Sequence, residues 1–93
     1  MSKSIMQNAK ECYVTGSPQG LHKHHIFEGT ANRRLSEKYG MWVWLRTDWH
    51  NMSDYGVHFD KALDIRLKIE GQRKFEKRYA HDKFMEVFGK NYL

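Results

Sequence analysis

The sequence predicts a small α+β domain in which two strands flank a short helix and are followed by helical structure. The chain has 93 residues, which is enough for one hydrophobic core. Segments 21–27 and 41–46 contain the apolar, aromatic and β-branched residues typical of strands. From residue 59 onward, apolar residues recur at spacings of three and four, as in an amphipathic helix.

The N-terminal part divides into two segments. Residues 1–10 are polar without a clear period and predict a flexible arm, so that residues 11–93 form the single domain. Residues 11–20 contain the only proline and two of the seven glycines, which predicts a strand-turn or knuckle. The segment LHKHHIF at 21–27 predicts the first strand, closed by Glu28 and Gly29.

The next segment, 31–40, predicts a short helix. Asn32 is the candidate N-cap, residues 33–39 form the body and Gly40 ends it. The segment MWVWLR at 41–46 predicts a buried strand, and residues 47–58 are rich in turn formers and predict a loop.

Residues 59–89 predict a C-terminal helical extension. Over 63–70 the apolar residues also alternate with charged ones, which is strand spacing, but no breaker interrupts the helical pattern that follows and we favour helix. Gly71 is the expected point of a kink or division, and Gly89 is the expected end.

Charge and cysteine content narrow the class of protein. Lys and Arg number 16 against 11 Asp and Glu, and the net charge of +5 favours polyanionic partners such as nucleic acid. The lone Cys12 excludes an internal disulfide and a four-cysteine zinc site. The sequence has no apolar run of about 18–20 residues and no leader pattern, so we expect no membrane association and a cytoplasmic location.

The histidines carry the functional signal. His24 and His25 are neighbours in the first strand, where successive side chains point to opposite faces, so one can face a metal and the other a substrate. His50 follows the second strand, and His58 comes near the start of the helical region. Three imidazole ligands with open positions are typical of a catalytic metal site, although an isolated histidine pair is also common on exposed strands.

The ordered segments KHHIF, ANRR, SEKYG, HNMSD and GVHF resemble the HNH endonucleases, also called ββα-metal or His-Me finger nucleases. The likeness is to the small HNH-like proteins encoded by phages and prophages of Gram-positive bacteria, and it covers residues 11–93. It implies a ββα-metal finger: a two-stranded antiparallel hairpin plus a helix, with an inserted short helix and C-terminal helices.

The resemblance also implies residue roles. His24 and His50 match metal ligands, and His25 matches the general base that takes a proton from the attacking water. His58 is the preferred last ligand. Many members of that family place that ligand four residues after the previous one, where this chain has Asp54, which is the alternative last ligand.

The asparagine of the motif, which helps to orient the base, corresponds to Asn32, with Asn51 as the alternative. The implied cofactor is one divalent ion, Mg²⁺ or Mn²⁺ for catalysis, and Zn²⁺ or Ni²⁺ can occupy the same ligands. No structural zinc knuckle is expected: Thr15 stands where the partner of Cys12 would be, and the second cysteine pair would fall near Arg46 and Trp49.

The function implied by the resemblance is metal-dependent hydrolysis of DNA phosphodiester bonds in a bacterial host cell. Arg33, Arg34 and Arg46 are the candidate contacts to DNA phosphates, and the sequence does not distinguish among them. A homodimer or a phage packaging or replication complex is compatible with the same resemblance. The alternatives are a non-catalytic nucleic-acid-binding module and a phage adaptor that keep the fold.

Overall fold

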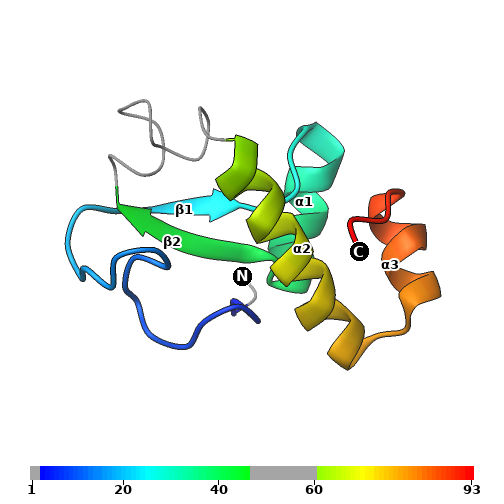
Figure 1. Ribbon diagram of the computed structural model, residues 1–93, viewed down its shortest axis with the longest axis horizontal. Helices are drawn as coiled ribbons and strands as arrows, with labels where there is room; N and C mark the ends of the chain where they lie inside the picture. The colour runs from blue at the N-terminus through cyan, green and yellow to red at the C-terminus, as the bar shows by residue number, and fades with distance from the viewer. Residues whose placement is uncertain (1–2, 47–60) are drawn as a thin grey trace.

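The computed structural model describes residues 3–46 and 61–93 of the chain (Figure 1). In chain order the elements are β1 (Leu21–His25), α1 (Thr30–Tyr39), β2 (Trp42–Arg46), α2 (Lys61–Arg78) and α3 (His81–Phe88). The predicted α+β class is therefore confirmed at the level of two antiparallel strands and three helices. None of the helices in these two ranges has the length and apolar character needed to cross a bilayer.

The two strands form an antiparallel pair, in which His24 lies opposite Val43 and His25 lies opposite Trp42. Because successive residues alternate, this register gives the hairpin two distinct faces. His24, Val43 and Leu45 share one face and are all buried. The opposite face carries His25 and Trp42 together with the pair formed by Lys23 and Trp44.

The core lies between the hairpin and the C-terminal helices. Val43 and Leu45 belong to the same buried cluster as Leu67 and Phe75 of α2. Aromatic rings connect this cluster to α3: the ring centroids of Phe75 and Phe84 lie 5.4 Å apart in an edge-on arrangement. Burial of these large side chains is the main source of stability in so small a domain.

The first strand ends two residues earlier than predicted. Ile26 and Phe27 are buried but follow the strand, and the Ser36 hydroxyl of α1 bonds both to the amide and to the carbonyl of Phe27. A helix side chain therefore satisfies backbone groups that a neighbouring strand would otherwise pair.

Helix α1 begins before Asn32, so the predicted N-cap is wrong. The N-cap is Gly29, whose φ of 92° turns the chain sharply, and the carbonyl of Gly29 accepts a hydrogen bond from the amide of Arg33 at 2.8 Å. Asn32 consequently lies inside the first helical turn. The predicted end at Gly40 is confirmed: this residue adopts the left-handed conformation, with φ 71°.

The helical prediction for the C-terminal region is confirmed over residues 61–88, but the division does not occur at Gly71. The chain leaves α2 after Arg78, and Ala80, with φ −71° and ψ 158°, starts α3. Gly71 lies inside α2 and is buried; a methyl group added there would lie 3.0 Å from Met41 Cε. This glycine permits the helix to approach the hairpin closely.

The N-terminal segment runs along β2. The Ser4 hydroxyl donates to the carbonyl of Trp42 and the amide of Ile5 donates to the carbonyl of Gly40. The amide of Trp44 donates to Gln7 Oε1 at 2.7 Å. Because these contacts are polar, they leave no hydrophobic period in the sequence from which the packing of this segment could be predicted. The division of the chain at residue 10 stays a prediction. Residues 4–7 of the expected arm cover the edge of β2 that does not pair with β1.

Candidate functional site

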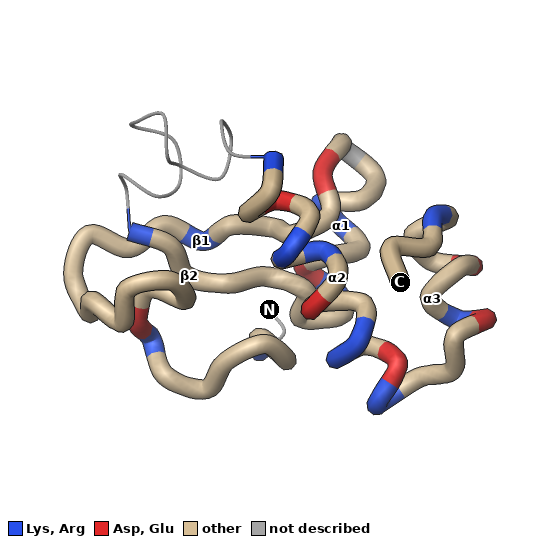
Figure 2. The backbone as a smooth tube through the Cα atoms, in the orientation of Figure 1, with Lys and Arg blue, Asp and Glu red and all other residues tan. Residues whose placement is uncertain are grey.

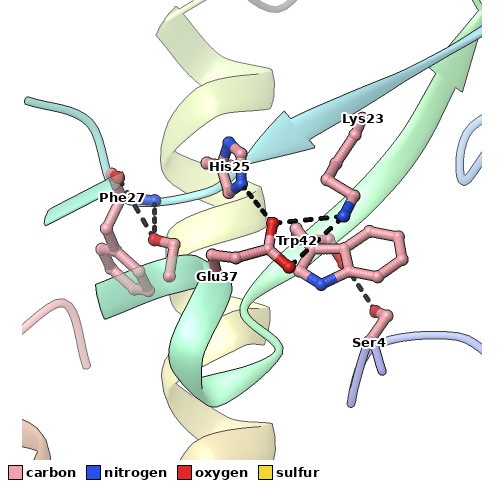
Figure 3. Close-up of polar contacts among 7 residues, drawn as sticks. Ser4, Lys23, His25, Phe27, Glu37 and Trp42 are labelled. Carbon is pink, nitrogen blue, oxygen red and sulfur yellow. Dashed lines mark hydrogen bonds and ion pairs between the residues drawn. The ribbon is translucent and has the colours of Figure 1, made fainter. Parts of the chain in front are cut away.

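The candidate site is centred on His25, the last residue of β1. Its Nε2 atom lies 2.9 Å from Oε1 of Glu37, which comes from α1 (Figure 3). Lys23, two residues earlier on the same face of the strand, places its Nζ atom 3.1 Å and 3.3 Å from the two oxygens of the same carboxylate. One carboxylate therefore joins the general-base candidate to a lysine.

The same carboxylate determines the hydrogen position on the His25 ring. Partial burial raises the pKa of Glu37, but the hydrogen bonds from His25 and Lys23 outweigh burial and hold this pKa below its usual range. Glu37 is thus ionised at neutral pH and only accepts hydrogen bonds. Nε2 of His25 must carry the proton, and Nδ1 is left as the acceptor in the neutral ring.

Lys23 also contacts the neighbouring strand. Its Nζ atom lies 4.2 Å from the centroid of the Trp42 ring, a cation–π distance. The side chains of Lys23 and His25 are 20% and 22% exposed. The side chains of Lys23 and His25 are therefore partly buried, which restricts their motion, and partly accessible from solvent.

His24 lies on the other face of the hairpin and is only 2% exposed. The predicted opposition of the two histidines is thus confirmed, with His24 directed to the side of the core and His25 to the side of Glu37. The other predicted metal ligands, His50 and His58, and the alternative Asp54 lie outside the described residues.

A metal centre consequently rests on one described ligand. Within residues 3–46 and 61–93 no group of three or more His, Cys, Asp or Glu side chains is placed to hold a metal. The donor type of His24 suits a divalent transition metal, because buried neutral imidazole is a common ligand. His24 therefore fits the implied ion as a single ligand, and the other predicted ligands follow β2 in the sequence and stay predictions.

The structure describes only one of the two candidates for the motif asparagine. Asn32 is half-buried in the first turn of α1, the helix that also carries Glu37. Glu37 is five positions after Asn32, which places the two about 140° apart around the helix axis, on different sides. Asn51 lies outside the described residues, and the role of the motif asparagine stays a prediction.

The three predicted phosphate contacts lie on two elements, with Arg46 at the end of β2 and Arg33 and Arg34 in α1. Arg46 pairs with Leu21, whereas His25 pairs with Trp42 at the other end, about 13 Å away at the usual rise of a strand. Arg33 and Arg34 are exposed on α1. They precede Glu37 by four and three residues, which places them on the same side of the helix as this carboxylate.

The knuckle at residues 12–16 packs on the end of β2. Cys12 is buried, and burial raises the pKa of its thiol, but hydrogen bonds from Thr15 and from the backbone amides of Arg46 and Val14 reverse this and lower the pKa. The amide of Thr15 donates to the Cys12 sulfur at 3.4 Å, and the backbone of Arg46 also hydrogen-bonds this thiol.

Glu37 is the site residue that sequence reasoning missed. It belongs to SEKYG, one of the segments that carry the resemblance, and this was the available signal. No spacing rule connects residue 37 to residue 25, because the two lie on different elements and meet only through the packing of α1 on β1.

Comparison with known proteins gives no match: no family model, no curated protein and no solved structure is significantly similar to the chain.

Proposed function

We propose that this protein is a metal-dependent endonuclease of the HNH type, which hydrolyses phosphodiester bonds in DNA. The observation that carries the proposal is the hydrogen bond between His25 and Glu37. A histidine with one ring nitrogen held by an ionised carboxylate and the other directed away is the arrangement expected of a general base.

In the proposed reaction, Nδ1 of His25 takes a proton from the water whose oxygen attacks phosphorus. The P–O bond to one of the two bridging oxygens breaks, and this leaving oxygen takes a proton from solvent. The imidazolium that forms is stabilised by the Glu37 carboxylate, which accepts from Nε2 before and after the transfer. Glu37 is a positioning residue in this scheme, because it acts through His25. Lys23 keeps the carboxylate ionised and fixes its orientation.

The divalent ion, when bound by His24 together with His50 and either His58 or Asp54, would offset the charge that develops on the phosphate. Arg33 and Arg34 are the proposed phosphate contacts near the reaction site, since they share a helix side with Glu37. The distance between Arg46 and the His25 end of the hairpin favours a more remote contact for Arg46.

Two other functions remain candidates within the same resemblance. A nucleic-acid-binding module would keep DNA affinity without cleavage, and a phage adaptor would show affinity for a protein partner with little dependence on salt. A groove beside β2 that is lined by Lys3, Lys10 and Arg78 favours DNA binding over the adaptor.

The test is a plasmid-cleavage assay in which the protein is stripped with EDTA and then supplied with Mg²⁺, Mn²⁺, Ni²⁺ or Zn²⁺ in turn. We expect nicking or linearisation with at least one ion and its loss in His25→Ala. A folded protein that binds DNA but leaves it intact with every ion would instead identify a binding module.

A further inference from the structure

A second feature of the molecule is an open groove of about 660 Å³ beside β2. The N-terminal segment forms one side of this groove, β2 contributes the rings of Trp42 and Trp44, and the last turn of α2 contributes Arg78. Figure 1 shows the N-terminal segment lying next to β2.

The lining of the groove is basic. Lys3, Lys10 and Arg78 line it, and none of the described lining residues is acidic. All three are exposed, so their charges are available to a ligand. Over the chain as a whole, basic and acidic positions are interspersed, as along α2 in Figure 2, and the groove departs from this mixture.

One of these cations covers a tryptophan ring of the groove. Lys10 Nζ lies 4.8 Å from the centroid of the Trp44 ring, and the rings of Trp42 and Trp44 meet edge to face at 5.3 Å. Trp42 is only 7% exposed. The lining is therefore suited to charge recognition, and stacking of bases on Trp44 would require Lys10 to move.

The groove and His25 belong to the same face of the hairpin. Trp42, which lines the groove, is the cross-strand partner of His25. Lys23 lies over the Trp42 ring and bonds the carboxylate that holds His25. A long ligand lying in the groove would therefore continue toward the His25 site.

We propose that this groove binds the phosphodiester backbone of the DNA strand that flanks the reaction site, through Lys3, Lys10 and Arg78. The proposal rests on the proposed function for the identity of the polyanion, and it names a binding surface separate from the reacting groups. Cations at separate points of a groove suit repeating phosphates, and the covered tryptophan faces make the contact independent of base sequence.

The test measures DNA affinity without cleavage. Binding of a labelled duplex, and of the matching single strand, each about 20 nucleotides long, is followed by fluorescence anisotropy in EDTA between about 0.05 and 0.2 M salt. The triple variant Lys3→Gln/Lys10→Gln/Arg78→Gln is compared with the control Arg73→Gln/Lys77→Gln/Lys90→Gln. The control removes the same charge from exposed positions that do not line the groove.

At about 0.9 salt-slope units per phosphate contact, loss of three contacts should lower the slope of log K against log salt by about 2.7 and the affinity at 0.1 M salt by on the order of 100-fold. The control triple variant should change the salt slope and the affinity far less. Thermal unfolding of each variant establishes that it is folded. Equal losses in the two triple variants, or no binding of either DNA form by the wild-type protein at low salt, would overturn the proposal.

His25→Ala separates this inference from the proposed function. We expect the variant to bind DNA as the wild type does, so the groove can be tested even where no cleavage occurs. If the protein binds DNA through the groove but never cleaves it, the groove proposal stands and the nuclease proposal fails. If the protein cleaves DNA and the groove variant binds as the wild type does, the nuclease proposal stands and the groove proposal fails.

Discussion

At the scale of single residues, the His25 ring depends on Glu37 for its proton position. Glu37→Gln keeps the size of the side chain but weakens acceptance from Nε2 and stabilisation of the imidazolium. We expect cleavage to fall by about 10- to 100-fold, the range for partners that orient a functional histidine. Single-turnover cleavage rates measure this effect.

DNA affinity should not fall in Glu37→Gln, because the substitution removes one negative charge from the side of α1 that carries the proposed phosphate contacts Arg33 and Arg34. Glu86→Gln, an exposed position on α3, is the matched control. Wild-type cleavage by Glu37→Gln would remove Glu37 from the mechanism.

A second residue-scale prediction concerns Tyr13, whose hydroxyl donates to Glu70 Oε1 at 2.6 Å. Burial, together with this hydrogen bond and the charge of Glu70, raises the pKa of Tyr13 from 10 to about 12. The folded state thus holds the proton more tightly than the unfolded state, so the stabilisation is fully present below pH 10 and is lost as the pH rises toward 12.

Tyr13→Phe should therefore lower the free energy of unfolding by about 1 kcal/mol at neutral pH. The difference from wild type should narrow as the pH rises from about 8 to about 11, because only the wild type loses the hydroxyl contribution. Urea unfolding at the two pH values measures it. A difference that stayed constant or grew would contradict the assigned role of this hydrogen bond.

At the scale of elements, the turn between α1 and β2 depends on Gly40. This residue has φ 71°, and a methyl group there would overlap the backbone carbonyl oxygen of Lys3. Gly89, which ends α3 at φ 74°, has nothing within 4 Å of that position. The two glycines share a backbone conformation and differ in their surroundings, so they form a matched pair.

Gly89→Ala should lower the free energy of unfolding by about 1 kcal/mol, the cost of left-handed backbone for a residue with a Cβ atom. Gly40→Ala should cost about 2–4 kcal/mol, because overpacking against the N-terminal segment adds to that cost. Chemical denaturation of both variants gives the comparison. Equal losses would mean that the N-terminal segment yields freely to the added methyl group.

Some features of the helices and strands could be predicted from the sequence, and others could not. The strands and the C-terminal helices follow from hydrophobic period and composition, which are local. The N-cap at Asn32 was wrong because Gly29 turns the chain earlier. The division at Gly71 was wrong because that glycine permits close packing of α2 on Met41 and Ile26, which is a tertiary contact.

At the scale of the whole molecule, the same distinction applies to the site. The opposed directions of His24 and His25 follow from strand alternation and were predictable. The bond between His25 and Glu37 depends on how α1 packs against β1, and the groove depends on the N-terminal segment meeting β2 and α2. Such arrangements join distant parts of the chain and leave no periodic signal.

We propose that His25 acts as the base in metal-dependent DNA hydrolysis. The most direct measurement is the single-turnover cleavage rate of a labelled duplex by the wild type and by His25→Ala, with Mg²⁺ or Mn²⁺ added and DNA binding followed on the same preparations. We predict cleavage by the wild type, a fall of at least about 100-fold in the variant, and equal binding. Cleavage by His25→Ala at the wild-type rate, or intact DNA bound by a folded wild-type protein with either ion, would contradict the account.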